Sequence, residues 1–92
     1  SLPKSFYLKQ NYPNPFNPTT KIRFDLPYDG EVQISIYDIK GALIEEVMSG
    51  WMEAGYHNLK WNGNQNASGI YFIKMTADDN KFQKTMKMSL IK

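Results

Sequence analysis

The sequence predicts an all-β domain of six or seven short strands. Apolar and polar residues alternate with a period of two through most of the chain after residue 20, which is the pattern of strands with one buried face. No stretch repeats apolar residues at helical spacing over three turns. Turn-forming residues recur roughly every 8 to 12 positions, a spacing typical of an antiparallel immunoglobulin-like β-sandwich.

Length and composition indicate one small globular domain. The 92 residues are 41% hydrophobic and 22% charged, an ordinary globular composition that allows one modest core. There is no cysteine, which excludes disulfides, thiolate chemistry and Cys-based zinc sites. The net charge of +2 comes from scattered basic residues, which argues against a nucleic-acid partner. The sequence contains no run of about 20 apolar residues, which is the length that a membrane-spanning helix requires.

The first 19 residues are predicted to form an extended strap, separate from a sandwich made by residues 20–92. The segment Asn11–Pro18 contains three prolines in eight residues, which excludes a helix or a central strand. Each asparagine that precedes a proline is extended, and its side chain can close local turns. We expect the strap to cross one edge of the sandwich and block aggregation there, with Phe16 and Tyr12 inserted as plugs.

The first two strands of the sandwich are predicted at about residues 20–26 and 32–37. Pro27 closes the first strand, and the Asp29-Gly30 turn precedes the second. The two strands should form a hairpin or lie as neighbours across the core. Asp38–Gly41 supplies the next turn, because an aspartate side chain bonds the backbone two residues on and Gly41 accepts a positive φ.

Residues 42–48 fit either a short helix or a strand, and the flanking turns favour a strand. The next strand, between Gly55 and Gly63, places His57, Leu59 and Trp61 on one face, and Trp61 is the predicted central core aromatic. Residues 62–69 are rich in asparagine and glycine, as loops are.

Two further strands, at residues 70–77 and about 82–90, are joined by an Asp78-Asp79-Asn80 turn. The first is dense in β-branched and aromatic residues, which is typical of a central strand. The second alternates an apolar series with Gln83, Thr85, Lys87 and Ser89. Its predicted inner positions are Phe82, Met86, Met88 and Leu90.

No catalytic, cofactor or metal site is predicted, so we do not expect an enzyme. A Ser-His-Asp triad would have to use His57, the only histidine, which lies on the predicted core face and is interpreted as structural. No other histidine, cysteine or paired acidic residues could complete a metal site with it. Residues 78–80 lack the glycine and glutamate of a calcium loop.

Six aromatic residues have two interpretations. They could form a flat carbohydrate-binding platform, or they could pack into the core. Packing is favoured, because a small domain must recruit loop aromatics, and Trp51 is the best exposed candidate. The platform would suit an alternative function, a carbohydrate-binding or spacer module of a secreted polysaccharide-degrading enzyme. The residues concerned are Tyr7, Tyr12, Phe16, Tyr28, Trp51 and Tyr56.

The segment Gln10–Thr20 closely resembles the opening motif of type A C-terminal sorting domains of the type IX secretion pathway. Similar blocks follow at Ile22–Phe24, Ile36–Gly41, Ala54–His57 and Lys87–Lys92. Immunoglobulin-like domains of flagellar hook-capping proteins share some later blocks but lack the Asn-Pro opening. The structural motif positions singled out are Asn11, Pro13, Asn14, Pro15, Phe16, Asn17, Pro18, Gly41, Trp61, Gly63, Gly69 and Tyr71.

The resemblance implies a non-catalytic seven-stranded sandwich at the C-terminus of a secreted protein of a Gram-negative bacterium. It implies a cargo domain before Ser1 and recognition by an outer-membrane translocon in the periplasm. It also implies, for many members, removal by a sortase-like protease, with the cargo released or attached at the cell surface.

The last strand is where the resemblance implies that the sorting signal concentrates. We expect a partly free edge there, to which a receptor adds by backbone pairing while Lys84, Lys87 and Lys92 set its orientation. By charge pattern alone, the C-terminal cluster of Lys81, Lys84, Lys87 and Lys92 is a solvated face. The candidate recognition residues are Lys84, Thr85, Lys87, Met88, Leu90, Ile91 and Lys92.

Overall fold

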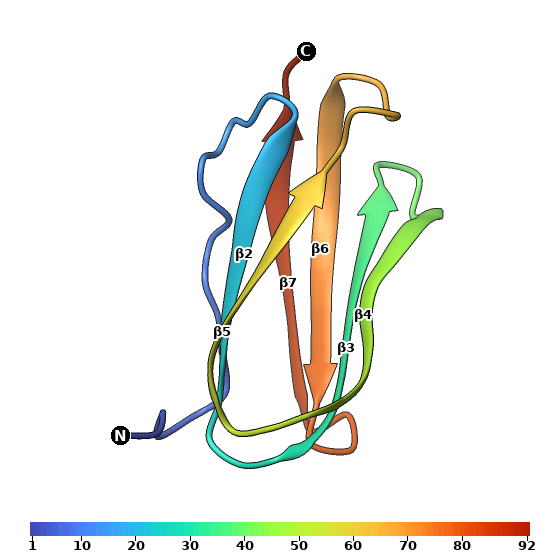
Figure 1. Cartoon of the computed structure of the whole chain (residues 1–92). Helices are drawn as coiled ribbons and strands as arrows, with labels where there is room; N and C mark the ends of the chain where they lie inside the picture. The colour runs from blue at the N-terminus through green and yellow to red at the C-terminus, as the bar shows by residue number, and fades with distance from the viewer.

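The computed structural model describes all of residues 1–92 and contains seven strands in two antiparallel sheets (Figure 1). One sheet has the order β1-β2-β5 and the other β4-β3-β6-β7, so the predicted all-β sandwich is confirmed. No helix long and apolar enough to cross a membrane is present. The strands are β1 (Tyr7–Leu8), β2 (Thr19–Leu26), β3 (Gly30–Asp38), β4 (Leu43–Met52), β5 (Gly55–Asn62), β6 (Gly69–Ala77) and β7 (Phe82–Leu90).

The core lies between the inner faces of the two sheets. Strands β2 and β3 belong to different sheets, so the predicted hairpin between them does not form. The alternating residues of β2, β3, β6 and β7 supply most of the buried positions, as the period-two pattern predicts. Trp61 is the largest fully buried side chain, which confirms it as a core aromatic.

Strand β4 occupies the segment whose sequence fits a helix or a strand. Its pairing with β3 shifts register twice, between Ile34 and Ser35 and between Ile36 and Tyr37. Each irregularity breaks the period-two pattern, which explains why the apolar residues of β4 do not alternate. The strand continues to Met52, so Trp51, expected in a loop, lies in a strand instead.

The turn after β3 has the predicted side-chain chemistry. The Asp38 Oδ1 atom accepts hydrogen bonds from the backbone N–H groups of Lys40 and Ala42, each at 2.9 Å. Gly41 has a φ of +84°, a conformation that a residue with a Cβ adopts at a cost. This turn therefore depends on Asp38 and Gly41 together.

The strap crosses from one sheet to the other along the sandwich edge (Figure 1). Tyr12 bridges Lys21 of β2, and Phe16 bridges Leu90 of β7. Phe16 is a plug, with only 2% of its surface exposed. The expectation that Tyr12 is a second plug is wrong, since its side chain is 75% exposed. Adjacent side chains of an extended segment point to opposite sides, and the neighbouring Asn11 takes the inner position.

Candidate functional site

Strand β7 forms one edge of the four-stranded sheet, and its outward backbone groups define the candidate site. The Ser89 carbonyl oxygen accepts a hydrogen bond from the Phe16 N–H at 2.9 Å, and the Ser89 N–H donates to Asn14 Oδ1 at 2.9 Å. Both Ser89 groups therefore point away from β6. In an antiparallel ladder every second residue shares this orientation, so the N–H and C=O groups of Lys87, Thr85 and Gln83 also point outward.

The strap covers only one half of this edge. In the covered half, the Gln10 Nε2 atom donates to the Lys87 carbonyl at 2.9 Å, and Phe16 and Asn14 bond Ser89. In the other half, no group of the chain bonds the outward N–H and C=O of Gln83 and Thr85. Open strand edges of this kind pair readily with another chain.

The seven candidate recognition residues separate into three groups. Lys84, Thr85, Lys87 and Ile91 are exposed. Met88 and Leu90 are 0% and 1% exposed and belong to the core, so a partner cannot contact their side chains in the folded domain.

Lys92 forms the third group, because its ammonium is held by a loop of the same chain. The Nζ atom donates to the carbonyl oxygens of Asn64 at 2.6 Å and Asn66 at 2.9 Å. The backbone N–H of Lys92 donates to Ser68 Oγ at 2.9 Å. These bonds attach the end of the chain to the loop between β5 and β6.

The Asn-Pro motif is held together by side-chain amides. Asn11 is buried, and its Nδ2 atom donates to Thr20 Oγ1 at 3.0 Å and to the Pro13 carbonyl at 3.3 Å. The Thr20 hydroxyl also donates to the Pro13 carbonyl, at 2.9 Å. Because prolines lack an N–H, these side chains supply the donors that the backbone cannot.

The motif residues Gly63 and Tyr71 pack beside the strap, around Trp61. The Trp61 ring centroid lies 5.8 Å from that of Phe16 and 6.1 Å from that of Tyr71. A Cβ at Gly63 would lie 3.2 Å from side-chain atoms of Leu90 and Trp61, so the loop approaches closely because this residue is glycine. The Tyr71 hydroxyl donates to the Ala67 carbonyl at 2.6 Å.

His57 has structural contacts. Its ring stacks on Phe24 with centroids 5.2 Å apart, and its Nε2 atom lies 2.7 Å from the Glu53 carbonyl oxygen. No group of three or more His, Cys, Asp or Glu side chains is placed to hold a metal ion. The turn at Asp78–Asn80 has three consecutive positive φ angles, as tight hairpin connections require.

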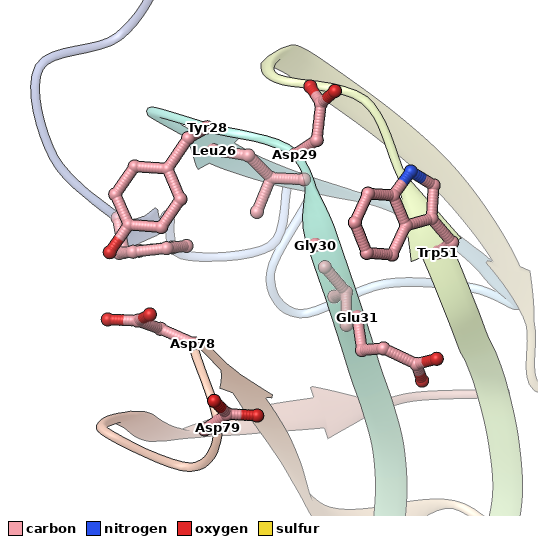
Figure 2. Close-up of a pocket in the computed structure, with 10 residues that line it drawn as sticks. Leu26, Tyr28, Asp29, Gly30, Glu31, Trp51, Asp78 and Asp79 are labelled. Atoms are coloured by element: carbon pink, nitrogen blue, oxygen red, sulfur yellow. The ribbon is translucent and has the colours of Figure 1, made fainter.

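A cavity of about 220 Å³ opens at the end of the sandwich near the β2–β3 connection and the β6–β7 turn (Figure 2). Tyr28 and Trp51 stand on opposite sides of it (Figure 2), so their rings do not form one flat platform. The Asp78 carboxylate accepts a hydrogen bond from the Tyr28 hydroxyl and raises the pKa of Tyr28. The acidic lining residues are Asp29, Glu31, Asp78 and Asp79.

The expectation that the six aromatics of the possible platform pack into the core is confirmed for Phe16 only. Beside Tyr7 and Tyr12, the neighbouring residues Leu8 and Asn11 take the buried positions instead. The exposed aromatics are Tyr7, Tyr12, Tyr28, Trp51 and Tyr56. Alternation alone could have placed Tyr7 and Tyr56 outside.

Comparisons with known proteins agree with the fold and motif. The family model described as the secretion system C-terminal sorting domain matches residues 10–89. Dimeric latent PorU from Porphyromonas gingivalis superposes with a TM-score of 0.70 and 18% identity, over 91% of this chain and 9% of that chain. At this identity, PorU shows a shared fold alone.

PorZ from the same organism, an essential surface component of its type IX secretion system, superposes with a TM-score of 0.61 and 25% identity. The match covers 95% of this chain and 11% of PorZ, so the chain spans about a tenth of each neighbour. No curated protein matches the sequence. The family match covers far more than half of the chain and confirms the resemblance of the Asn-Pro motif. The chain therefore belongs to the family of secretion system C-terminal sorting domains, the sorting signals of type IX secretion.

Proposed function

We propose that residues 1–92 act as a single non-catalytic sorting domain that directs a larger cargo protein, joined before Ser1, through the type IX translocon. The cargo crosses the periplasm of a Gram-negative bacterium and is released or attached at the cell surface, where a sortase-like protease acts on the domain. The family match over residues 10–89 carries this proposal. The small share of PorU and PorZ that the chain covers supports a role as one part of a longer protein.

The recognition surface that we propose is the open half of the β7 edge. A receptor strand pairs with the outward N–H and C=O groups of Gln83 and Thr85, in the manner of β-strand addition. Lys84 and Lys87 favour an acidic strand and set its orientation. Lys92 is not included, because the carbonyl groups of Asn64 and Asn66 already hold its ammonium.

The experiment fuses residues 1–92 to the C-terminus of a fluorescent protein in a host with type IX secretion. Thr85→Pro removes the outward N–H of Thr85 without removing a bond to β6, and edge strands tolerate proline at such positions. We expect fluorescence outside the cell to fall at least about tenfold for this variant, because strand addition depends on the main-chain bonds of the edge. Thr85→Val keeps the N–H and should be delivered normally.

Thermal unfolding of both purified variants confirms that each is folded. Normal delivery of a folded Thr85→Pro variant would show that the receptor does not pair with this edge. Failure of the unaltered domain to deliver the reporter would contradict the sorting function itself.

The lysines are tested in the same host by charge reversal. Lys84→Glu combined with Lys87→Glu should reduce delivery, and more strongly at low ionic strength, because exposed charges are screened by salt. The matched control reverses Lys21 and Lys60, which are exposed and pair across the other sheet. Equal loss in both double variants would attribute the effect to net charge rather than to the β7 edge.

A further inference from the structure

We propose that the covered half of the β7 edge is a second strand-binding site, which the strap fills from within the chain. An extended segment of the secretion receptor, bearing an aromatic side chain, replaces the strap there. This inference rests on the proposed sorting function and names the chemistry of the partner.

The strap already binds β7 in the way that a separate peptide would. The Phe16 N–H donates to the Ser89 carbonyl, and the Ile91 N–H donates to the Phe16 carbonyl, each at 2.9 Å. The bridge between Phe16 and Leu90 is parallel. The Phe16 ring is buried beside Trp61, in a space that we name the Phe16 socket. Main-chain bonds together with one pocketed side chain are the features of β-strand addition.

The strap is, however, a short occupant of this site. Pro15 precedes Phe16 and Pro18 lies two residues after it, and neither can donate a backbone hydrogen bond. Backbone pairing with β7 is therefore confined to one residue. The strap also leaves the outward groups of Gln83 and Thr85 without a partner in the chain.

A continuous strand can make more backbone hydrogen bonds with β7 than the strap makes. Outward N–H and C=O groups run from Gln83 to Ile91 along a β7 strand that pairs with β6 in unbroken register. A strand without proline can use all of them. The partner's segment therefore runs parallel to β7, carries an aromatic side chain for the Phe16 socket and carries acidic side chains toward Lys84 and Lys87.

The test measures binding in solution, independently of secretion. The probe is a fluorescent synthetic peptide with the sequence of Gln10–Thr20, and the receptor is the intact 92-residue domain with its strap weakened by Phe16→Ala. We expect this variant to bind the probe at least about tenfold more tightly than the unaltered domain, because its own strap no longer fills the socket. A probe with alanine in place of phenylalanine should lose this gain.

Two further variants keep the result decisive. Tyr12→Ala removes an exposed aromatic of the same strap and should leave probe binding as in the unaltered domain. Asn14→Ala removes the bond to the Ser89 N–H while keeping Phe16, and should increase probe binding at least about threefold even if Phe16→Ala fails to fold.

The proposal is overturned if folded Phe16→Ala and Asn14→Ala bind the probe no better than the unaltered domain, or if the alanine probe binds equally well. Sedimentation of the unaltered domain distinguishes another occupant, since a dimer with exchanged straps would assign the socket to a second copy and also overturn it. In the secretion assay, Asn14→Ala should be delivered at least as fast as the unaltered domain. Slower delivery of Asn14→Ala alone would contradict strap release while leaving the sorting function intact.

Discussion

Asparagine side chains in the strap make hydrogen bonds that its proline-rich backbone does not make. Asn11 bonds Thr20 and the Pro13 carbonyl from a buried position, and Asn14 accepts the outward N–H of Ser89. No buried side-chain nitrogen or oxygen of the chain is left without a partner. At the residue scale, the Asn-Pro pattern is therefore explained by the requirements of the fold, and a receptor need not read it.

Replacing Asn11 by alanine tests this explanation. The change removes the Asn11 donor from the Thr20 hydroxyl oxygen, whereas the Pro13 carbonyl keeps the Thr20 hydroxyl as a donor. We expect the loss to cost about 1 to 3 kcal/mol of unfolding free energy. Asn17 is exposed and its side chain makes no hydrogen bond, so Asn17→Ala should stay within about 0.5 kcal/mol of the unaltered domain. Denaturant unfolding measures both values. Equal losses would show that Asn11 has no special structural role.

Tyr28 gives a pH-dependent prediction. Asp78 raises the pKa of Tyr28 above 10.0 by accepting its hydrogen bond, so the bond stabilises the fold below pH 10 and is lost as the pH rises through the higher folded-state pKa. Ultraviolet titration of the phenolate, with Tyr28→Phe subtracted, isolates this residue. Asp78→Asn should move its titration to lower pH. An unchanged titration would show that Asp78 does not control the Tyr28 proton.

At the scale of elements, strand β7 serves the core and the surface at once. Its inner face contributes Met88 and Leu90 to the core, whereas its outer edge offers backbone groups to a partner. Alternation in a strand separates the two roles by one residue. Recognition can therefore be altered at Thr85 or Lys87 without altering the core.

Deletion of Lys87–Lys92 tests the contribution of β7 to the core. The deletion removes two core side chains, each worth about 2 to 5 kcal/mol when truncated to alanine, from a domain class with about 5 to 15 kcal/mol of stability. We expect the truncated domain to be unfolded by circular dichroism and undelivered for that reason. Lys84→Ala combined with Lys87→Ala, the folded control, should keep the full unfolding transition. A folded truncation would contradict the core role of these residues.

At the scale of the whole molecule, the two ends of the sandwich differ. The end that carries the C-terminus (Figure 1) is closed by the strap, Trp61, Gly63 and Tyr71 packed together. The acidic cavity of Figure 2, with the exposed aromatics Tyr28 and Trp51 on either side, lies at the opposite end. Phe16, Trp61, Gly63 and Tyr71 at the closed end are among the structural motif positions. They therefore stabilise the region in which β7 ends, and they set how much of its edge remains open.

The sequence by itself determined strands β2 to β7 and the family, but not β1, because clear alternation and proline geometry are local properties of the backbone. It predicted Trp61 in the core and the turn at Asp38–Gly41. Only the tertiary structure decided that β2 and β3 belong to different sheets, that Tyr12 points outward, and that the Lys92 ammonium is bound to a loop. These features depend on contacts between residues far apart in the chain. The division of the β7 edge into open and covered halves is of this kind, since the strap reaches it from more than 70 positions away.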